Sequence, residues 1–87
     1  MPDEKGQLLG RVTHYFNKIG VAVIELTAGD LKVGDTIKIE RHEGDFDQLV
    51  NSMQVNHQEV QSAKTGESFG LKVDQPVKAG NSVYKIS

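Results

Sequence analysis

One short pattern occurs three times in the chain and constrains the fold more than any other feature. It consists of an apolar residue, Lys, any residue, Gly, an acid or amide, a hydroxyl residue and a second apolar residue. The copies lie at residues 31–37 (LKVGDTI), 63–69 (AKTGESF) and 77–83 (VKAGNSV), and alternating apolar residues follow each of them. Any fold proposed for the chain must use this pattern three times.

The pattern has a direct physical interpretation. A Gly between polar residues accepts the positive φ of a tight turn, and the neighbouring Asp, Glu, Asn, Thr or Ser side chain can bond local backbone groups. The apolar residue that ends each copy then begins a strand. Three such turns predict an all-β domain, and they carry no information about function by themselves.

The rest of the chain predicts about six short strands. They are expected at residues 7–16, 19–26, 35–41, 46–56, 67–74 and 82–86, with turns between them; the spacing of Val60 and Ala63 also suits a single helical turn. Short strands at regular spacing, with no long helix, indicate a small barrel that is closed or nearly closed. Closure would remove the exposed edges that invite aggregation.

Three finer expectations concern which side chains face the core. In the first strand, Leu8, Gly10, Val12 and Phe16 alternate and predict its buried face. The second strand is almost continuously apolar, which predicts burial on much of both faces. In the fourth strand the alternation slips between Val50 and Met53, and a β-bulge would explain such a slip.

Composition bounds the rest. The 87 residues predict a flexible tail at 1–6 and a single domain at 7–87. The chain has no Cys, so disulfides and thiolate metal sites are excluded, and no stretch approaches the ~20 apolar residues of a membrane span. A soluble cytoplasmic protein is therefore expected. The net charge of −2 argues against a general nucleic-acid coat but allows a local basic patch.

The sequence offers little chemistry. It contains no glycine frame for a phosphate loop, so GTP binding by this chain alone is not expected. The histidines at 14, 42 and 57 match no compact metal-ligand spacing, and the acids at 43, 45 and 47 lack the spaced pattern of a calcium loop. No catalytic residue, metal or cofactor is predicted, and the chain is not expected to be an enzyme.

Four segments in order carry a resemblance to a known family. They are residues 10–24, with GRV and then VAVI, and the three copies of the repeated pattern. This set resembles the second domain of translational GTPases such as elongation factor Tu and initiation factor two. The resemblance implies a Greek-key β-barrel of about six strands without catalytic function. In the family this domain contacts aminoacyl-tRNA in some members and ribosomal RNA in others, and it packs against the GTPase domain, which this chain lacks. A similar barrel is appended to some collagenase-like peptidases as an accessory module.

Two hypotheses about function therefore stay open. The first is a module that binds tRNA, ribosomal RNA or the ribosome through cations and aromatic rings. Its candidate residues are Arg11, Tyr15, Lys18, Lys38, Arg41 and His42, with Lys18 carried over from the first hairpin loop of the family. The second is a protein-interaction module that docks on a larger enzyme, such as a GTPase or a peptidase, and the acidic balance of the chain favours it slightly.

Overall fold

The computed structural model describes residues 7–56 and 58–86, and these residues form ten β-strands and no helix. The strands are β1 (Gln7–Phe16), β2 (Val21–Leu26), β3 (Leu31–Lys32), β4 (Thr36–Glu40), β5 (Phe46–Leu49), β6 (Met53–Val55), β7 (Gln58–Val60), β8 (Ser62–Ala63), β9 (Ser68–Lys72) and β10 (Ser82–Lys85). The prediction of an all-β chain is confirmed for these residues. The predicted tail at 1–6 lies outside them.

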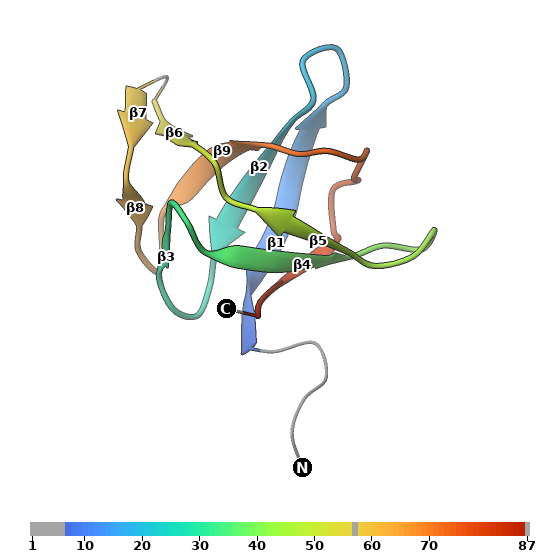
Figure 1. Cartoon of the computed structure of the whole chain (residues 1–87), viewed down its shortest axis with the longest axis horizontal. Coiled ribbons are helices and arrows are strands. Elements are labelled where there is room, and N and C mark those ends of the chain that lie inside the picture. The colour runs from blue at the N-terminus through green and yellow to red at the C-terminus, as the bar shows by residue number, and fades with distance from the viewer. Residues whose placement is uncertain (1–6, 57, 87) are drawn as a thin grey trace.

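Eight of the strands form one antiparallel sheet that curls around the core. Its order is β5-β4-β10-β1-β2-β9-β6-β7, and β3 and β8 form a separate pair (Figure 1). Strands β5 and β7 are the two edges, so the sheet is open. The prediction of a closed barrel of six strands is therefore wrong in both closure and strand number.

The reason for the open sheet lies between β5 and β6. A continuous strand at 46–56 would have joined the β4 side of the sheet to the β9 side. Instead, the chain leaves the sheet at residues 50–52. The turn that precedes β4 binds Val50 on both sides: the Val50 N–H donates to the Asp35 carbonyl at 2.9 Å, and the Gly34 N–H donates to the Val50 carbonyl at 2.9 Å. The predicted bulge is thus a break between two strands.

The repeated pattern forms the predicted turn in all three copies. Its glycines, at 34, 66 and 80, have φ values of 101°, 92° and 97°, which an L-residue rarely adopts. In each copy the acid or amide side chain accepts a hydrogen bond from the backbone N–H of the Lys three residues earlier. These pairs are Lys32–Asp35 at 3.1 Å, Lys64–Glu67 at 2.7 Å and Lys78–Asn81 at 2.9 Å. The turns lead into β4, β9 and β10.

The core consists of the inward-facing apolar side chains of these strands. Leu9, Ile24, Ile39 and Phe69 are at most 1% exposed and belong to one contiguous cluster. Strand β2 alternates between buried and half-buried residues along its whole length. The predicted burial on much of both faces is therefore confirmed for one face only, and the residues of the other face are half-buried because only one face of the curled sheet points to the interior.

Strand β1 carries two irregularities that change which side chains point inward. Its register shifts between Leu8 and Gly10 opposite β10, and between Val12 and His14 opposite β2. Gly10 and Val12 are buried as predicted, but Leu8 and Phe16 are 47% and 50% exposed. A bulge adds one residue and therefore reverses which side chains point inward beyond it. A prediction that assumes strict alternation along the whole strand does not include this reversal.

The predicted helical turn near Val60 and Ala63 is wrong as well. Both residues lie in short strands, where Val60 pairs with Met53 and Ala63 pairs with Leu31. Their side chains reach the core from extended backbone, and the pairing satisfies their backbone groups. None of the described segments forms a helix that is long and apolar enough to cross a membrane.

Candidate functional site

A concave surface lies on the outer face of the sheet beside the β1–β2 hairpin. A concave region of about 370 Å³ is lined there by Phe16, Ile19, Val21, Val23, Gln54, Asn56, Ser68, Phe69 and Gly70. We call it the outer groove. Four segments build it: the hairpin, β9, β6 and the residue after β6. The hairpin projects from the body of the molecule at the top of Figure 1.

Local geometry explains why apolar side chains line this outer face. The bulge near Val12 turns Tyr15 toward the core and leaves Phe16 outside. In the turn that follows, Ile19 is 62% exposed. Across β2, the backbone of Val23 pairs with Gly70, which has no side chain to fill the floor. The groove therefore exists because no side chain projects from Gly70, and the apolar hairpin forms its border.

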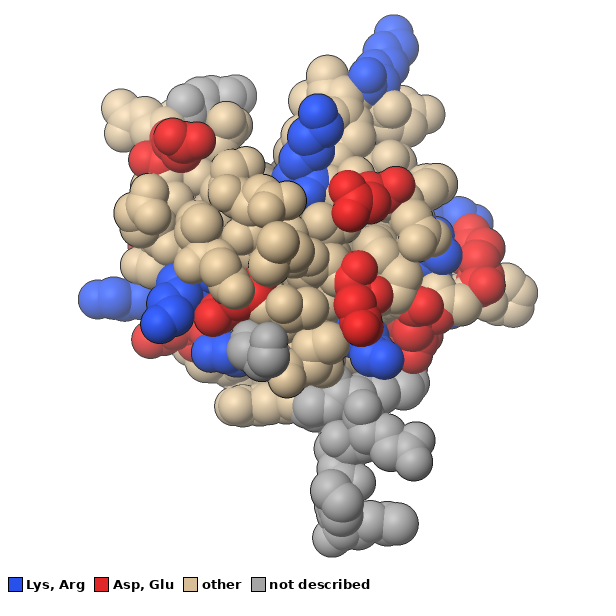
Figure 2. Space-filling model, viewed as in Figure 1, with Lys and Arg blue, Asp and Glu red and all other residues tan. Residues whose placement is uncertain are grey.

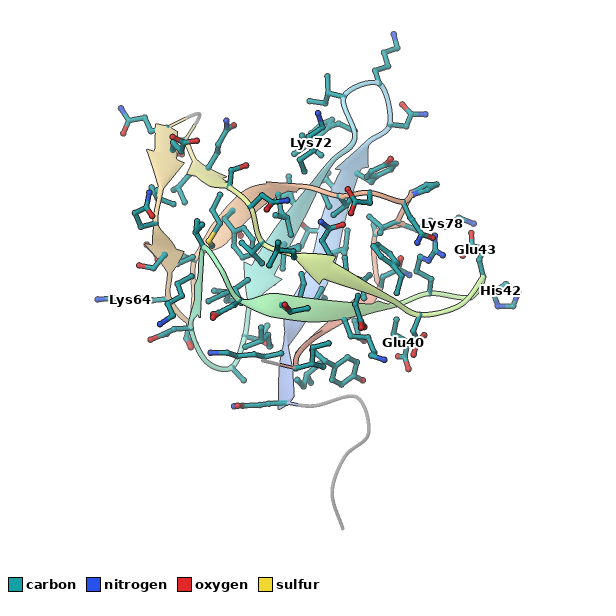
Figure 3. All side chains as sticks on the ribbon, viewed as in Figure 1. Glu40, His42, Glu43, Lys64, Lys72 and Lys78 are labelled. Carbon is teal, nitrogen blue, oxygen red and sulfur yellow. The ribbon has the colours of Figure 1, made fainter. Side chains whose placement is uncertain are left out.

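Aromatic and polar groups surround the groove. The His14 ring stacks on Phe16 with centroids 6.4 Å apart and planes at 7°. Lys72 lies across from Val21 and lines the adjoining hollow (Figure 3), and Lys18 occupies the hairpin turn. Within residues 7–56 and 58–86, neither lysine ammonium forms a hydrogen bond or an ion pair. The side-chain amide of Gln54 faces the same region.

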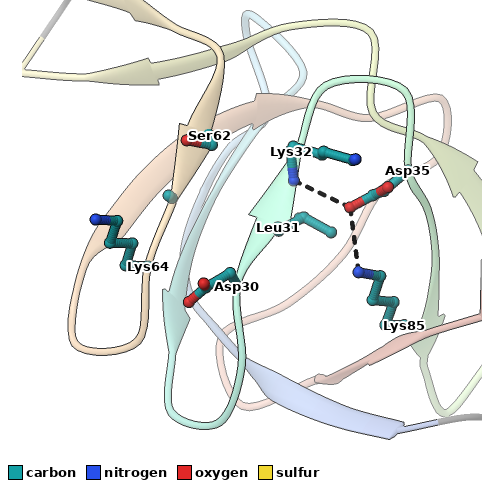
Figure 4. A pocket seen from close by; sticks show the side chains of 8 residues that line it. Asp30, Leu31, Lys32, Asp35, Ser62, Lys64 and Lys85 are labelled. Carbon is teal, nitrogen blue, oxygen red and sulfur yellow. Dashed lines mark hydrogen bonds and ion pairs between the residues drawn. The ribbon is translucent and has the colours of Figure 1, made fainter.

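A second, smaller hollow of about 280 Å³ lies between β3, β8 and β10. Asp35 is one of the residues that line it, and its side chain is only 9% exposed. The Asp35 carboxylate accepts a hydrogen bond from the backbone N–H of Lys32 at 3.1 Å. It also forms an ion pair with the Lys85 ammonium at 3.5 Å (Figure 4). This carboxylate is thus satisfied by the turn and the neighbouring strand. The hollow is explained by the fold, and we assign no ligand to it.

The six residues predicted to bind RNA do not converge on one patch. Arg11 on β1 pairs with Glu25 at 3.2 Å, and Lys38 on β4 pairs with Asp47 at 3.6 Å. Tyr15 is half-buried against the core. On the face drawn in Figure 2, lysines and arginines are interspersed with acids. Of the predicted set, Lys18 alone lies in the β1–β2 turn, next in sequence to Ile19, which lines the outer groove.

Arg41 serves the fold at the end of the β4–β5 hairpin. Its guanidinium donates to the Gly44 carbonyl at 2.8 Å, the Pro76 carbonyl at 2.8 Å and the Gln75 side-chain oxygen at 2.9 Å. It also lies 4.7 Å from the centre of the Phe46 ring. These contacts hold the hairpin against residues 75–76. Most of the donors that an RNA phosphate would need are therefore engaged within the chain.

The electrostatics of this hairpin affect one acid. A hydrogen bond to its own backbone lowers the pKa of the Glu43 carboxyl, and the positive charges of Lys78, Arg41 and His42 lower it further. Figure 3 shows Glu43, His42 and Lys78 at this end of the molecule. In the part of the chain that the structure describes, no three His, Cys, Asp or Glu side chains are placed to hold a metal. His57 lies outside that part.

Sequence reasoning missed most of the outer groove. It assigned Phe16 to the core, read the valines at 21 and 23 as part of a strand buried on much of both faces, and did not single out Gln54, Gly70 or Lys72. One signal was available: the apolar Ile19 directly precedes Gly20, and glycine is a residue type that is common in turns. The convergence of β1, β2, β6 and β9 required the sheet topology.

Comparisons with known proteins place the chain among segments of larger proteins. No protein-family model matches it. It is 46% identical over 79 residues to an uncharacterized protease of Methanocaldococcus jannaschii and 30% identical over 79 residues to a collagenase of Porphyromonas gingivalis. Each alignment covers 90% of this chain but only 19% and 22% of those proteins. The chain therefore spans about a fifth of the length of the curated relatives it matches.

Two solved structures share the fold. The C-terminal domain of a putative U32 peptidase from Geobacillus thermoleovorans superposes with a TM-score of 0.85 at 19% identity, covering all of both chains. A bacterial selenocysteine-specific elongation factor superposes with a TM-score of 0.75 at 25% identity, covering 94% of this chain and 15% of that one. The predicted likeness to a translation-factor domain is thus confirmed for the fold, and the peptidase domain is a better match.

Proposed function

We propose that this chain is a non-catalytic accessory domain that works with the catalytic portion of a peptidase. One observation carries the proposal. The segment that matches this chain occurs in relatives named protease and collagenase, where about four-fifths of the protein lies outside the match. The full-length superposition on the C-terminal domain of a putative U32 peptidase supports the same reading. This was the second of the two hypotheses drawn from the sequence.

The distribution of ionisable groups agrees with an accessory role. A hydrolase needs a positioned nucleophile or metal-bound water beside an acid or base. Among the described residues, Asp35 and Glu67 bind backbone N–H groups of their own turns, and Glu25 and Asp47 pair with cations on neighbouring strands. Under this proposal, peptide-bond chemistry belongs to the catalytic portion of the peptidase.

The test uses the archaeal relative, from which the matched 79 residues are deleted; we call the product the truncated relative. This chain, purified alone, is titrated into it by calorimetry, and the chain is also fused in place of the deleted segment. We expect a one-to-one complex, a single cooperative melting transition for the fusion, and no hydrolysis of gelatin or casein by the chain alone. Two independent transitions in the fusion, or peptide hydrolysis by the chain alone, would overturn the proposal.

RNA binding is a second candidate because of the likeness to a domain of the selenocysteine-specific elongation factor. The net charge of −2 and the internal use of Arg11, Lys38 and Arg41 weigh against it. A titration with tRNA and short single-stranded RNA at 25 and 150 mM salt tests it. A phosphate-driven complex would weaken steeply with salt, and the absence of binding at low salt would remove this candidate.

A further inference from the structure

We propose that the outer groove is the surface through which this domain docks on the catalytic portion of the peptidase. Its occupant would be a protein segment that inserts apolar side chains and carries carboxylates at either side. This inference rests on the proposed function and adds the place and the chemistry of the contact. It is drawn from the exposed apolar side chains, the shape of the floor and two lysines that have no acidic partner among the described residues.

The apolar character of the hairpin has no explanation inside the domain. Phe16 and Ile19 are 50% and 62% exposed, whereas the core below them is sealed by residues such as Ile24 and Phe69 at 0% and 1%. Val21 and Val23 extend the same apolar surface along β2. A contiguous apolar patch of this kind on a small domain is typical of an interaction site, since each exposed side chain loses the free energy that burial would supply.

The shape of the groove suits side chains better than a cofactor. Its volume of about 370 Å³ is near the lower end of the range of about 300–1,000 Å³ for ligand pockets. The floor is open because Gly70 lacks a side chain; a methyl group there would contact Val21 at 3.4 Å. Gln54 and Asn56 lie at one side with amide groups that can bond a partner's backbone. One or two inserted apolar side chains would complete the surface.

Two lysines near the groove indicate that the partner segment carries carboxylates. Lys72 lines the hollow that continues from the groove, and Lys18 occupies the hairpin turn. No acid among the described residues pairs with either ammonium, although Arg11, Lys38 and Lys85 each have an acidic partner. Two unneutralised cations beside an apolar surface complement carboxylates that flank apolar side chains.

A protein partner fits this surface better than the alternatives. Single-stranded RNA is usually held by aromatic rings on which successive bases stack, whereas aliphatic side chains from Ile19, Val21 and Val23 make up much of this groove. A second copy of the chain, docked groove to groove about a two-fold axis, would bring the same lysines together, and like charges oppose such a contact.

The test maps the complex residue by residue. The ¹⁵N-labelled chain is titrated with the truncated relative, and amide shifts are followed by NMR. We expect the largest shifts at Phe16, Ile19, Gln54 and Gly70. The double variant Phe16→Ser/Ile19→Ser should bind at least ten-fold more weakly, as is typical when central apolar contacts are removed. The double variant Lys18→Glu/Lys72→Glu should also weaken binding, and more so at low salt.

A matched control comes from β5. Leu49 is 49% exposed, close to the value for Phe16, but it lies on the edge strand away from the groove. Leu49→Ser should leave the affinity unchanged. The amide spectra of all variants in the free state establish that each of them is folded.

The outcomes separate the two proposals. The docking surface would be overturned if the amide shifts clustered elsewhere, for example around Asp35. It would also be overturned if Leu49→Ser weakened binding as much as Phe16→Ser/Ile19→Ser does. In both cases the accessory role would still stand. Independent melting in the fusion would overturn both. Groove shifts caused by short RNA and lost with salt would replace the protein partner with a nucleic acid. Groove shifts that grow with the concentration of the chain alone would replace it with a second copy.

Discussion

The β1–β2 and β4–β5 hairpins each combine a phenylalanine with a cation, but they use them in opposite ways. At the β4–β5 hairpin, Phe46 is 8% exposed, and Arg41 binds it together with carbonyls from residues 44 and 76. At the β1–β2 hairpin, Phe16 is 50% exposed and Lys18 has no partner among the described residues. The β4–β5 hairpin is part of the structural framework, whereas the β1–β2 hairpin presents its side chains to the exterior. A residue type alone therefore does not identify a binding site.

The largest expected difference between the hairpins comes from their phenylalanines. Phe46→Ala should lower the free energy of unfolding by about 3 kcal/mol, because it removes a nearly buried ring and leaves a cavity. Phe16→Ala should lower it by about 1 kcal/mol or less, since half of that ring is already in water. Urea denaturation of both variants measures the difference. Equal losses would mean that the outer groove also serves stability, which would weaken its assignment as a docking surface.

The cations should differ next. Arg41→Ala removes three hydrogen bonds and the contact with Phe46, and a loss of about 1–2 kcal/mol in the free energy of unfolding is expected. Lys18→Ala should leave stability unchanged within the error of the measurement. Arg41→Lys is the informative control, because a lysine keeps the charge but cannot reproduce the planar fork. If it restores full stability, charge rather than geometry holds the β4–β5 hairpin.

The same contrast marks what the sequence could predict. The three turns were predictable because the glycine and the side chain that bonds the turn lie within four residues of each other. Arg41 was counted as a free cation because its partners Gln75 and Pro76 are 34 and 35 residues away. The openness of the sheet was missed for the same reason: the backbone of Val50 is held by the turn at Gly34 and Asp35. Turn hydrogen bonds can be predicted because they join residues that are close in sequence, whereas these long-range contacts depend on the topology of the sheet.

The outer groove shows a second limit of sequence reasoning. A run such as VAVIEL is equally compatible with burial on both faces and with burial on one face beside a groove. The bulge after Val12 then moved Phe16 from the predicted core to the exterior. Neither effect has a local signature in residue type. Both follow from how β1 pairs with β2.

Surface ion pairs should contribute much less and should not distinguish the hairpins. Arg11–Glu25 lies on the β1–β2 pair and Lys38–Asp47 on the β4–β5 pair, at 3.2 and 3.6 Å. Double-mutant cycles with Gln replacing the acids and Met replacing the cations should give coupling free energies of about 0.5 kcal/mol or less, falling as salt is added. A much larger coupling in one pair would reveal a cation that serves the framework in the way Arg41 does.

The smallest effect concerns the ionisation of Glu43 at the tip of the β4–β5 hairpin. Its pKa is lowered first by a hydrogen bond to its own backbone and then by Lys78, the strongest of the neighbouring charges. Lys78→Ala should therefore raise the pKa of Glu43 but leave it below the ordinary value. Lys18→Ala, at the other hairpin, should not change it. Titration of the ¹³C-labelled carboxyl by NMR measures both.

The sign of the corresponding stability effect follows from linkage. Because the folded state lowers the pKa of Glu43, its ionised form stabilises the fold at pH values above the unfolded pKa, and this contribution disappears as pH falls through the folded pKa. The group is fully exposed, so screening by water keeps the contribution small. Glu43→Gln should accordingly reduce stability slightly at pH 7 and not at pH 2. An equal loss at pH 2 and at pH 7 would show that the side chain acts through packing rather than through charge.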